Sequence, residues 1–380
     1  MKNKYQDISL KATKQGFIAE VNNNYLSINE LLYFAIRAYQ QYGSLVIAIK
    51  ENDRIKNHIP ENKIDEFEPI IKAKIKELYF LKGHKDYIHF KIKLIDKSVI
   101  KFFSKYLKAL FNTNVFFGLL MFSIVINGMY FFSNNIKPTE LTNYQSIIYS
   151  MIVFLSLMFH EFGHCIAVDN RTSKVKYIGF GLYNRVLPVL FADVSHIWQY
   201  EKTDRFIVNL GGVFIQLLIN VLLIVLLQFD VANELIEQVF LMNLYIIAYS
   251  LIPFLRNDGY WVLSDLIGVN NLHDKSKGYL LKLLFNNEKF NLSILVYSIL
   301  NFAFNILILY WIVFALSTVY GKYSIDHNQV FESENIAKSL LDLIIVTISL
   351  MIIHSKFSEY KSTISKIWLK RSVKIAIKKD

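Results

Sequence analysis

Residues Ile147–His164 read Ile-Ile-Tyr-Ser-Met-Ile-Val-Phe-Leu-Ser-Leu-Met-Phe-His-Glu-Phe-Gly-His, an apolar run that ends in His160, Glu161 and His164. With its flanking residues, over Tyr144–Val168, the run is long enough to cross a bilayer as a helix. A charged side chain at mid-membrane depth costs about 2.5–3.5 kcal/mol on insertion scales. Polar residues in such a helix are therefore expected to have a function.

The composition of the whole chain agrees with a membrane protein. Of its 380 residues, 53% are hydrophobic and 15% are aromatic, a level that soluble domains rarely reach. Segments long and apolar enough to span a bilayer lie near Val115–Phe132, Tyr144–Val168, Phe206–Gln228, Ile236–Leu255, Leu295–Val319 and Lys338–His354. The sequence therefore predicts a polytopic α-helical membrane protein with about six transmembrane helices and a small α/β N-terminal cytoplasmic domain.

Four parts of the chain differ in character. Residues 1–95 are polar and are predicted to form the cytoplasmic α/β domain. Residues 97–111 combine lysines with aromatic residues and are expected to lie on the membrane surface as an amphipathic helix. Residues 112–355 hold the spans, and the basic tail 356–380 is expected to be another interfacial segment.

Within residues 1–95, local patterns predict several elements. Two short strands are expected over Phe17–Val21 and Tyr25–Ile28, and Asn29 is expected to cap the helix that follows. A late strand is expected over His89–Ile95. These elements make the region a mixed α/β domain.

The net charge of +11 does not indicate a nucleic-acid partner. Lys and Arg gather beside the apolar runs, as contact with anionic lipid headgroups and the positive-inside rule both require. With six spans, all the basic segments fall on one side, which predicts that both termini are cytoplasmic. No secretory signal is expected in the first hundred residues, and a single cysteine, Cys165, excludes an internal disulfide.

The stretch His160-Glu161-Phe162-Gly163-His164 is an HExxH motif. On a helix, residues i and i+4 lie on one face, so both imidazoles can reach the same metal ion. Neutral imidazole suits Zn²⁺, and Glu161 is placed to take a proton from a metal-bound water. The competing interpretation, polar residues satisfied by neighbours in a buried helix, explains neither the spacing nor the depth. The motif therefore predicts a zinc site with a catalytic glutamate.

Asp258 is the candidate for a third protein ligand, which a tetrahedral site with two histidines and a water still lacks. It lies in Pro-Phe-Leu-Arg-Asn-Asp-Gly, just past the cytoplasmic end of the fourth predicted span. Pro253 cannot continue a regular helix, and Gly259 permits a turn that presents a carboxylate. An Asp-Gly turn that ends a helix is common by itself. Together with an HExxH motif at matching depth, it predicts a metal ligand.

An HExxH motif in one span, followed by a Pro…Asp-Gly segment at the end of a later one, resembles the site-2 protease group of intramembrane zinc metalloproteases. The resemblance is closest to the bacterial peptide zinc metalloprotease branch, which accompanies ribosomally made, modified peptides. Further similar stretches are Ile178–Tyr183, Ala192–Ser195, Arg205 with Leu210–Gly212, and Asp258–Gly268, so that the match covers roughly residues 145–275.

By this resemblance, His160, His164 and Asp258 bind Zn²⁺, Glu161 is the catalytic acid and base, and the chain lies in a bacterial cell membrane. The family usually has Asn eight residues before the ligand Asp; this chain has Ser250. That difference concerns substrate handling rather than the metal.

A second departure is Gly211-Gly212, where the family has Gly-Pro. Gln216 or Asn220 is a candidate for the Asn that usually follows.

Other residues are candidates to contact substrate or to support a metal ligand. They are Ser250, Asn257, Asp193 and His196. Asp193 is a candidate to hydrogen-bond a ligating imidazole, since such partners are usual. His196 could reach the site if its loop folds back, and the alternative is a surface histidine.

The strands and helices expected over Gly16–Asn52 resemble the small winged-helix domains that bind leader peptides in such pathways. Those domains commonly capture the leader as an added strand. The alternative is a cytoplasmic cap without a ligand.

The expected function is hydrolysis of a peptide bond in a ribosomally made peptide precursor, by a zinc-activated water and a Glu base, at a membrane. Two alternatives stay open. One is regulated intramembrane cleavage of a transmembrane signalling protein, which shares every catalytic residue. The other is a non-catalytic, metal-containing component that binds or exports a peptide, against which the intact Glu161 argues. A transporter would explain intramembrane charges but not the HExxH spacing.

Overall fold

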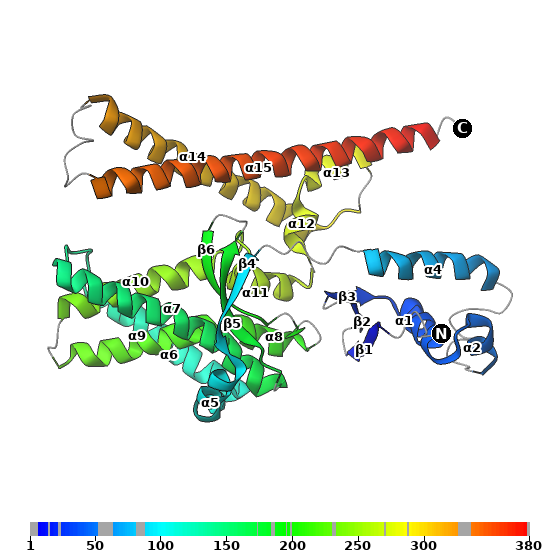
Figure 1. Cartoon of the computed structure of the whole chain (residues 1–380), viewed down its shortest axis with the longest axis horizontal. Helices are drawn as coiled ribbons and strands as arrows, with labels where there is room; N and C mark the ends of the chain where they lie inside the picture. Colours follow the sequence, from blue (N-terminus) through cyan, green and yellow to red (C-terminus); the bar gives the residue numbers. More distant parts are fainter. Residues whose placement is uncertain are drawn as a thin grey trace. The chain divides into compact units, whose positions relative to one another are not determined.

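A computed structural model describes residues 7–13, 16–21, 24–51, 64–80, 88–172, 174–183, 187–194, 196–197, 200–229, 233–269, 271–286, 289–325 and 336–377 (Figure 1). The chain divides into two compact units, Met1–Ser250 and Leu251–Asp380. Helices dominate both units, and the described strands form two three-stranded sheets.

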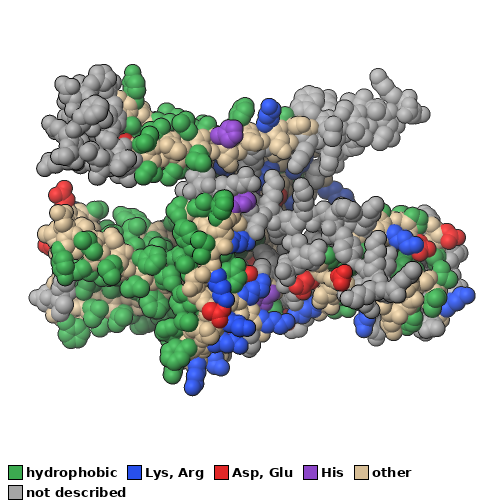
Figure 2. Space-filling model, in the orientation of Figure 1, with side chains coloured by type: hydrophobic (Ala, Val, Ile, Leu, Met, Phe, Trp, Pro, Cys, Tyr) green, Lys and Arg blue, Asp and Glu red, His purple; other side chains and the backbone are tan. Residues whose placement is uncertain are grey.

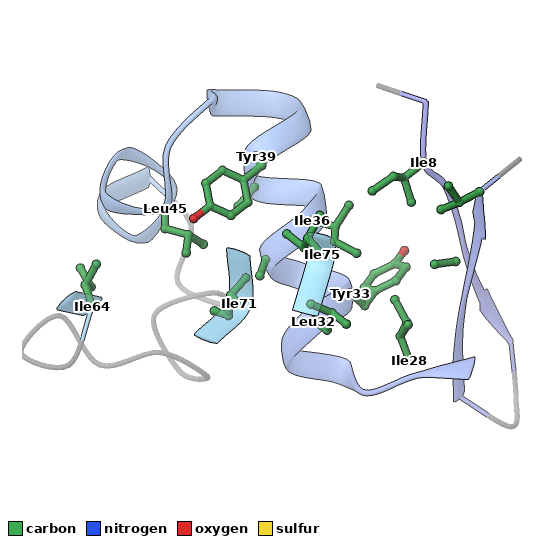
Figure 3. Close-up of a cluster of buried hydrophobic side chains, with 14 residues drawn as sticks. Ile8, Ile28, Leu32, Tyr33, Ile36, Tyr39, Leu45, Ile64, Ile71 and Ile75 are labelled. Carbon is green, nitrogen blue, oxygen red and sulfur yellow. The ribbon is translucent and has the colours of Figure 1, made fainter. Parts of the chain in front are cut away.

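The N-terminal part of the first unit packs an antiparallel sheet against helices. Its elements are β1 (Ser9–Thr13), β2 (Gly16–Val21), β3 (Asn24–Ile28), α1 (Glu30–Tyr42), α2 (Leu45–Glu51) and α4 (Ile64–Phe80). The two predicted strands are β2 and β3, and β1 pairs with β2 as a third strand that the sequence analysis did not predict. Figure 3 shows the shared core, in which buried side chains from the sheet, from α1 and from α4 lie together.

Local chemistry explains α1. Asn29 caps the helix as predicted, because its Oδ1 accepts a hydrogen bond from the Leu32 amide at 2.9 Å. Gly43 ends it in the left-handed conformation that glycine adopts without strain. Ile36 and Tyr39 share the buried face between these ends, which is the apolar stripe of a helix packed on one side.

The helices α6 (Thr113–Ser133), α7 (Asn143–Thr172), α9 (Gly211–Leu227) and α10 (Asn233–Ser250) form a bundle in which α7 packs against α9 and α10. Glycines allow the closest crossing. A Cβ atom built on Gly163 would lie 2.2 Å from the carbonyl oxygen of Gly211, so the backbones of α7 and α9 are in contact there. The short helix α8 (Lys202–Asn209) meets α9 at a bend of 46°.

A second antiparallel sheet joins β4 (Ile88–Asp96), β5 (Tyr177–Tyr183) and β6 (Leu187–Ala192). The late strand predicted over 89–95 therefore forms, but its partner is β5 and not the N-terminal sheet. Glycines in β5 permit this pairing, because a Cβ on Gly181 would lie 2.4 Å from the Ile88 side chain. From β4 the chain continues into α5 (Lys97–Leu107) and a 3₁₀ turn (Lys108–Phe111).

The second unit contains α11 (Asp258–Ile267), α12 (Leu272–Ser276), α13 (Tyr279–Asn286), α14 (Leu292–Ile325) and α15 (Ile336–Ile377). Tyr260, Leu272 and Tyr297 form a small buried core that joins α11, α12 and α14. The long helices α14 and α15 pack against each other. Residues 356–377 continue α15 without a break.

The expectation of about six spans is corrected. Among the described residues, α6, α7, α14 and α15 contain segments long and apolar enough to cross a membrane, and the bent pair α8–α9 makes a fifth if it is one span. The fourth predicted span, Ile236–Leu255, does not qualify because α10 carries polar residues. The amide of Gln238 donates to the Lys137 carbonyl at 2.9 Å, and Asn243 is fully buried, so these groups face protein. Several candidate spans in one chain indicate a multi-pass membrane protein.

Candidate metal centre

The HExxH motif lies on α7, where His160 and His164 are one turn apart. Both side chains are buried, and their Nε2 atoms are 3.1 Å from each other. Zinc–nitrogen bonds of about 2.0–2.1 Å in a tetrahedral site place two ligand nitrogens about 3.3 Å apart. The separation of the two Nε2 atoms therefore suits a shared zinc ion. Glu161, between them in the sequence, is partly exposed.

Hydrogen bonds at Nδ1 determine what the Nε2 atoms can do. The Nδ1 of His164 lies 2.7 Å from the carbonyl oxygen of Val208, which can only accept, so Nδ1 carries the proton. The Nδ1 of His160 lies 2.8 Å from Oε1 of Gln216 and donates to it in the same way. In a neutral ring, each Nε2 then holds a lone pair. Two lone pairs that face each other inside a protein repel, and a cation between them removes the repulsion, so the donor set fits Zn²⁺.

Helix α9 holds the ring of His160 from two sides. A Cβ atom on Gly212 would lie 2.5 Å from His160 Nε2, so the ring packs directly on the backbone of α9. Gln216, one helical turn later on the same face, accepts its Nδ1–H. From the sequence, Gln216 is a candidate only as the counterpart of a family Asn, and its contact with His160 is not predicted. No spacing in the sequence joins residues on two different helices.

We expect Gln216→Leu to weaken zinc affinity about 10–100-fold, because leucine fills a similar volume but cannot accept the Nδ1–H bond that holds the imidazole. Competition with a fluorescent chelator measures the affinity of the purified chain. Gln238→Leu is the matched control, since that amide is also buried but donates to the Lys137 carbonyl. Equal zinc affinity in the Gln216 and Gln238 variants would contradict the orienting role.

Asp258 is the first residue of α11, after Asn257 at the N-cap position. One donor atom from each of His160, His164 and Asp258 lies within 4.8 Å of the others. Two imidazoles and one carboxylate resemble the three-ligand sets of catalytic zinc sites, which leave a fourth position for water or substrate. These three residues are therefore a candidate metal site.

Within the second unit, several contacts hold the segment that precedes Asp258. The hydroxyl of Tyr297 donates to the Pro253 carbonyl at 3.0 Å. Gly259 is required for a close approach, because a Cβ atom there would lie 2.1 Å from the Leu251 carbonyl oxygen. The backbone around Asp258 is therefore held by the hydrogen bond from Tyr297 on α14 and by the close approach of Gly259 to Leu251.

An ion pair adds to this support. The guanidinium of Arg256 lies 2.9 Å from Asp274 on α12, and Lys277 approaches the same carboxylate at 3.0 Å. Burial raises the pKa of Asp274, but the two cations outweigh burial and lower that pKa to about 2. Because the folded-state pKa is below the ordinary value of about 4, the stabilisation is complete above that value and is lost as pH falls towards 2. The pair is therefore intact at neutral pH.

A buried polar network lies one turn before His160. Ser156 on α7 donates to Asn243 on α10 at 2.5 Å, and Asn243 donates to Asn220 on α9 at 3.0 Å. All three side chains are buried. Polar contacts of this kind join helices inside a membrane, so the network ties together the three helices around the histidines. No sequence pattern predicts this network, because each of the three residues stands alone in an apolar run.

The remaining candidates lie at different places. Asp193 forms an ion pair with Lys176 at 3.1 Å. The groups that bond the Nδ1 atoms of the motif histidines are Gln216 and Val208, and not Asp193 as the sequence suggested. Ser250 is buried at the last residue of α10.

The alternative that His196 is a surface histidine is wrong. It is buried, with Nε2 3.2 Å from the Thr172 hydroxyl at the end of α7, and burial, aided by Lys176, lowers its pKa.

Comparison with known proteins points to the same chemistry. The chain is distantly homologous to a Bacillus subtilis (strain 168) protein named "Putative peptide zinc metalloprotease protein YydH". The two are 25% identical over 186 residues, which cover 47% of this chain and 71% of that protein. No family model and no solved structure matches the chain.

Proposed function

We propose that this chain is a zinc metalloendopeptidase of the membrane, similar to site-2 proteases, that hydrolyses a peptide bond in a ribosomally made peptide precursor. The observation that carries the proposal is the pair of Nε2 atoms 3.1 Å apart, with both Nδ1 atoms engaged elsewhere. The candidate carboxylate ligand Asp258 and the name of the Bacillus subtilis homologue support it.

In the proposed mechanism, His160, His164 and Asp258 would hold a zinc ion, whose chemistry would be to lower the pKa of a coordinated water towards about 7 and to polarise the scissile carbonyl. Glu161 accepts the proton of the attacking water and returns it to the leaving amine. Gln216 and Val208 keep both imidazoles in the tautomer that presents Nε2. The substrate must present an extended backbone, because helical carbonyls are already hydrogen-bonded.

Metal analysis of the purified full-length chain tests the proposed site. We expect about one zinc per chain in the wild type, and loss or a sharp weakening in both His160→Ala and Asp258→Ala, because each removes one of three protein ligands. Asp204→Ala, at a carboxylate that faces Arg171, is the control and should keep its zinc. Wild-type protein that binds no metal when zinc is supplied would contradict the proposal. Zinc retained by Asp258→Ala alone would remove Asp258 from the ligand set.

We also propose that the N-terminal part binds the leader segment of the precursor as an added strand. Within the described residues the sheet order is β1-β2-β3, so the strand β3 lies at an edge. The closing pair of its hairpin is Val21 and Asn24, so Tyr25 and Ser27, at the alternate non-bonded positions, present their N–H groups outwards. An extended peptide can pair with such groups.

Ser27→Pro should weaken leader binding by roughly tenfold or more, because proline removes an outward N–H group without breaking the β2–β3 ladder. Ser27→Ala keeps the N–H and is the matched control. Fluorescence polarisation of a labelled precursor, with and without its leader, measures binding to the full-length chain. If Ser27→Pro and Ser27→Ala bind the leader equally, the β3 edge is not the leader site.

A further inference from the structure

The strand β4 exposes apolar side chains at places where its pairing is irregular. It is an edge strand, bonded within the described residues to β5 alone. Its register with β5 shifts between His89 and Ile92 and again between Lys93 and Ile95. Such bulges turn side chains away from the regular face of a sheet. In β4 they lie at Phe90 and Leu94, which are exposed.

Phe90 is the most unusual of these residues. Its side chain is 75% exposed, and its φ of 52° lies in the left-handed region that bulky residues rarely adopt. A polar residue or a glycine would meet water with less strain at this position. An exposed aromatic ring on a strained backbone therefore points to an apolar environment outside the protein.

The same surface continues on α5. Asp96 ends β4 and accepts the Ser98 amide at 3.4 Å as the cap of α5. The outer face of the helix exposes Phe102 and Tyr106, whose ring centroids are 5.6 Å apart. Its inner face is attached to α7, because the Ser104 hydroxyl donates to Asp169 at 2.6 Å.

Charge and position indicate what covers this surface. Exposed lysines alternate with the apolar residues along both elements: Lys91, Lys93, Lys97, Lys101, Lys105 and Lys108. The acidic member is Asp96, which pairs with Lys93. The candidate span α6 begins at Thr113, a few residues beyond, so the surface lies where the chain enters the membrane. Figure 2 shows Lys and Arg gathered at the end of the apolar helices where Figure 1 places β4 and α5.

We propose that β4 and α5 form one surface that binds an anionic phospholipid bilayer, with Phe90, Ile92, Leu94, Phe102 and Tyr106 at the acyl boundary and the lysines on the headgroups. Scattered apolar side chains separated by cations fit a fluid bilayer better than a protein groove. The inference goes beyond the proposed reaction and does not depend on it. It adds the strand β4 to the interfacial segment expected at 97–111, and it specifies anionic phospholipid as the lipid that this surface binds.

Site-specific labelling of the full-length chain tests the proposal. Because Cys165 is the single cysteine and is buried, Phe90→Cys and Phe102→Cys each offer one accessible thiol for a fluorophore. The labelled chain is reconstituted in vesicles of phosphatidylcholine, alone or mixed with phosphatidylglycerol. A quencher carried on lipid and iodide in the water report the surroundings of the label.

We expect the lipid-borne quencher to act at both positions, and phosphatidylglycerol to strengthen that quenching roughly twofold. The increase should vanish when Lys91, Lys93, Lys101 and Lys105 are all changed to Gln, and persist when Lys72, Lys74, Lys174 and Lys275 are changed instead. If iodide quenches the labels at both positions and the lipid-borne quencher does not, the proposal that β4 and α5 contact the bilayer is wrong. Lipid quenching that phosphatidylglycerol leaves unchanged would overturn the anionic preference.

Discussion

Glu161→Gln should lower peptide hydrolysis by about 10²–10⁴-fold, the usual contribution of a general base, while the chain keeps its zinc. Glutamine has nearly the shape of glutamate but cannot accept the proton of the attacking water. Neither the Nε2 pair of the histidines nor their Nδ1 partners involve Glu161, so the metal site should persist. Mass spectrometry of a precursor peptide measures cleavage, and metal analysis of the same sample measures zinc.

Glu140→Gln, at an exposed glutamate between α6 and α7, is the control and should cleave at the wild-type rate. A fully active Glu161→Gln variant would remove Glu161 from the mechanism. Loss of zinc together with activity would show instead that the carboxylate supports the metal site.

Gly163→Ala should prevent the close packing of α7 on α9. The added Cβ would lie 2.2 Å from the Gly211 carbonyl oxygen, which belongs to backbone and cannot turn away as a side chain can. Overpacking of a core typically costs about 1–3 kcal/mol, and a clash with backbone should reach the upper end of that range or exceed it. The expected result is a lower melting temperature in detergent, or no folded protein.

Gly118→Ala tests whether any added methyl group has this effect. Gly118 lies on α6, where a Cβ atom would meet nothing within 4 Å, and alanine is the better helix former. This variant should therefore melt no lower than the wild type. If Gly163→Ala and Gly118→Ala melt at the same temperature, the contact between α7 and α9 is not as close as the geometry indicates.

The predicted span over residues 236–255 shows how an apolar composition can overstate the number of transmembrane helices. The segment 236–255 is rich in apolar residues, yet α10 ends at Ser250 and directs Gln238 and Asn243 into protein contacts. The polar residues near the start of α10 and its end at Ser250 leave this helix less apolar than the sequence segment suggested. The number of spans therefore depends on where the helix begins and ends.

Local features were predicted from the sequence because they depend on residues close together in the chain. The spacing of His160 and His164 on one face of a helix, the cap at Asn29 and the hairpin of β2 and β3 follow from backbone geometry.

Tertiary structure alone decided how the histidines are held. Val208 and Gln216, which accept the two Nδ1–H bonds, lie far along the chain from α7, as does Gly211, which touches Gly163. It also decided that β4 pairs with β5. Contacts between distant segments leave no period or spacing in a sequence, because they depend on how helices and strands pack and not on where residues fall along one of them.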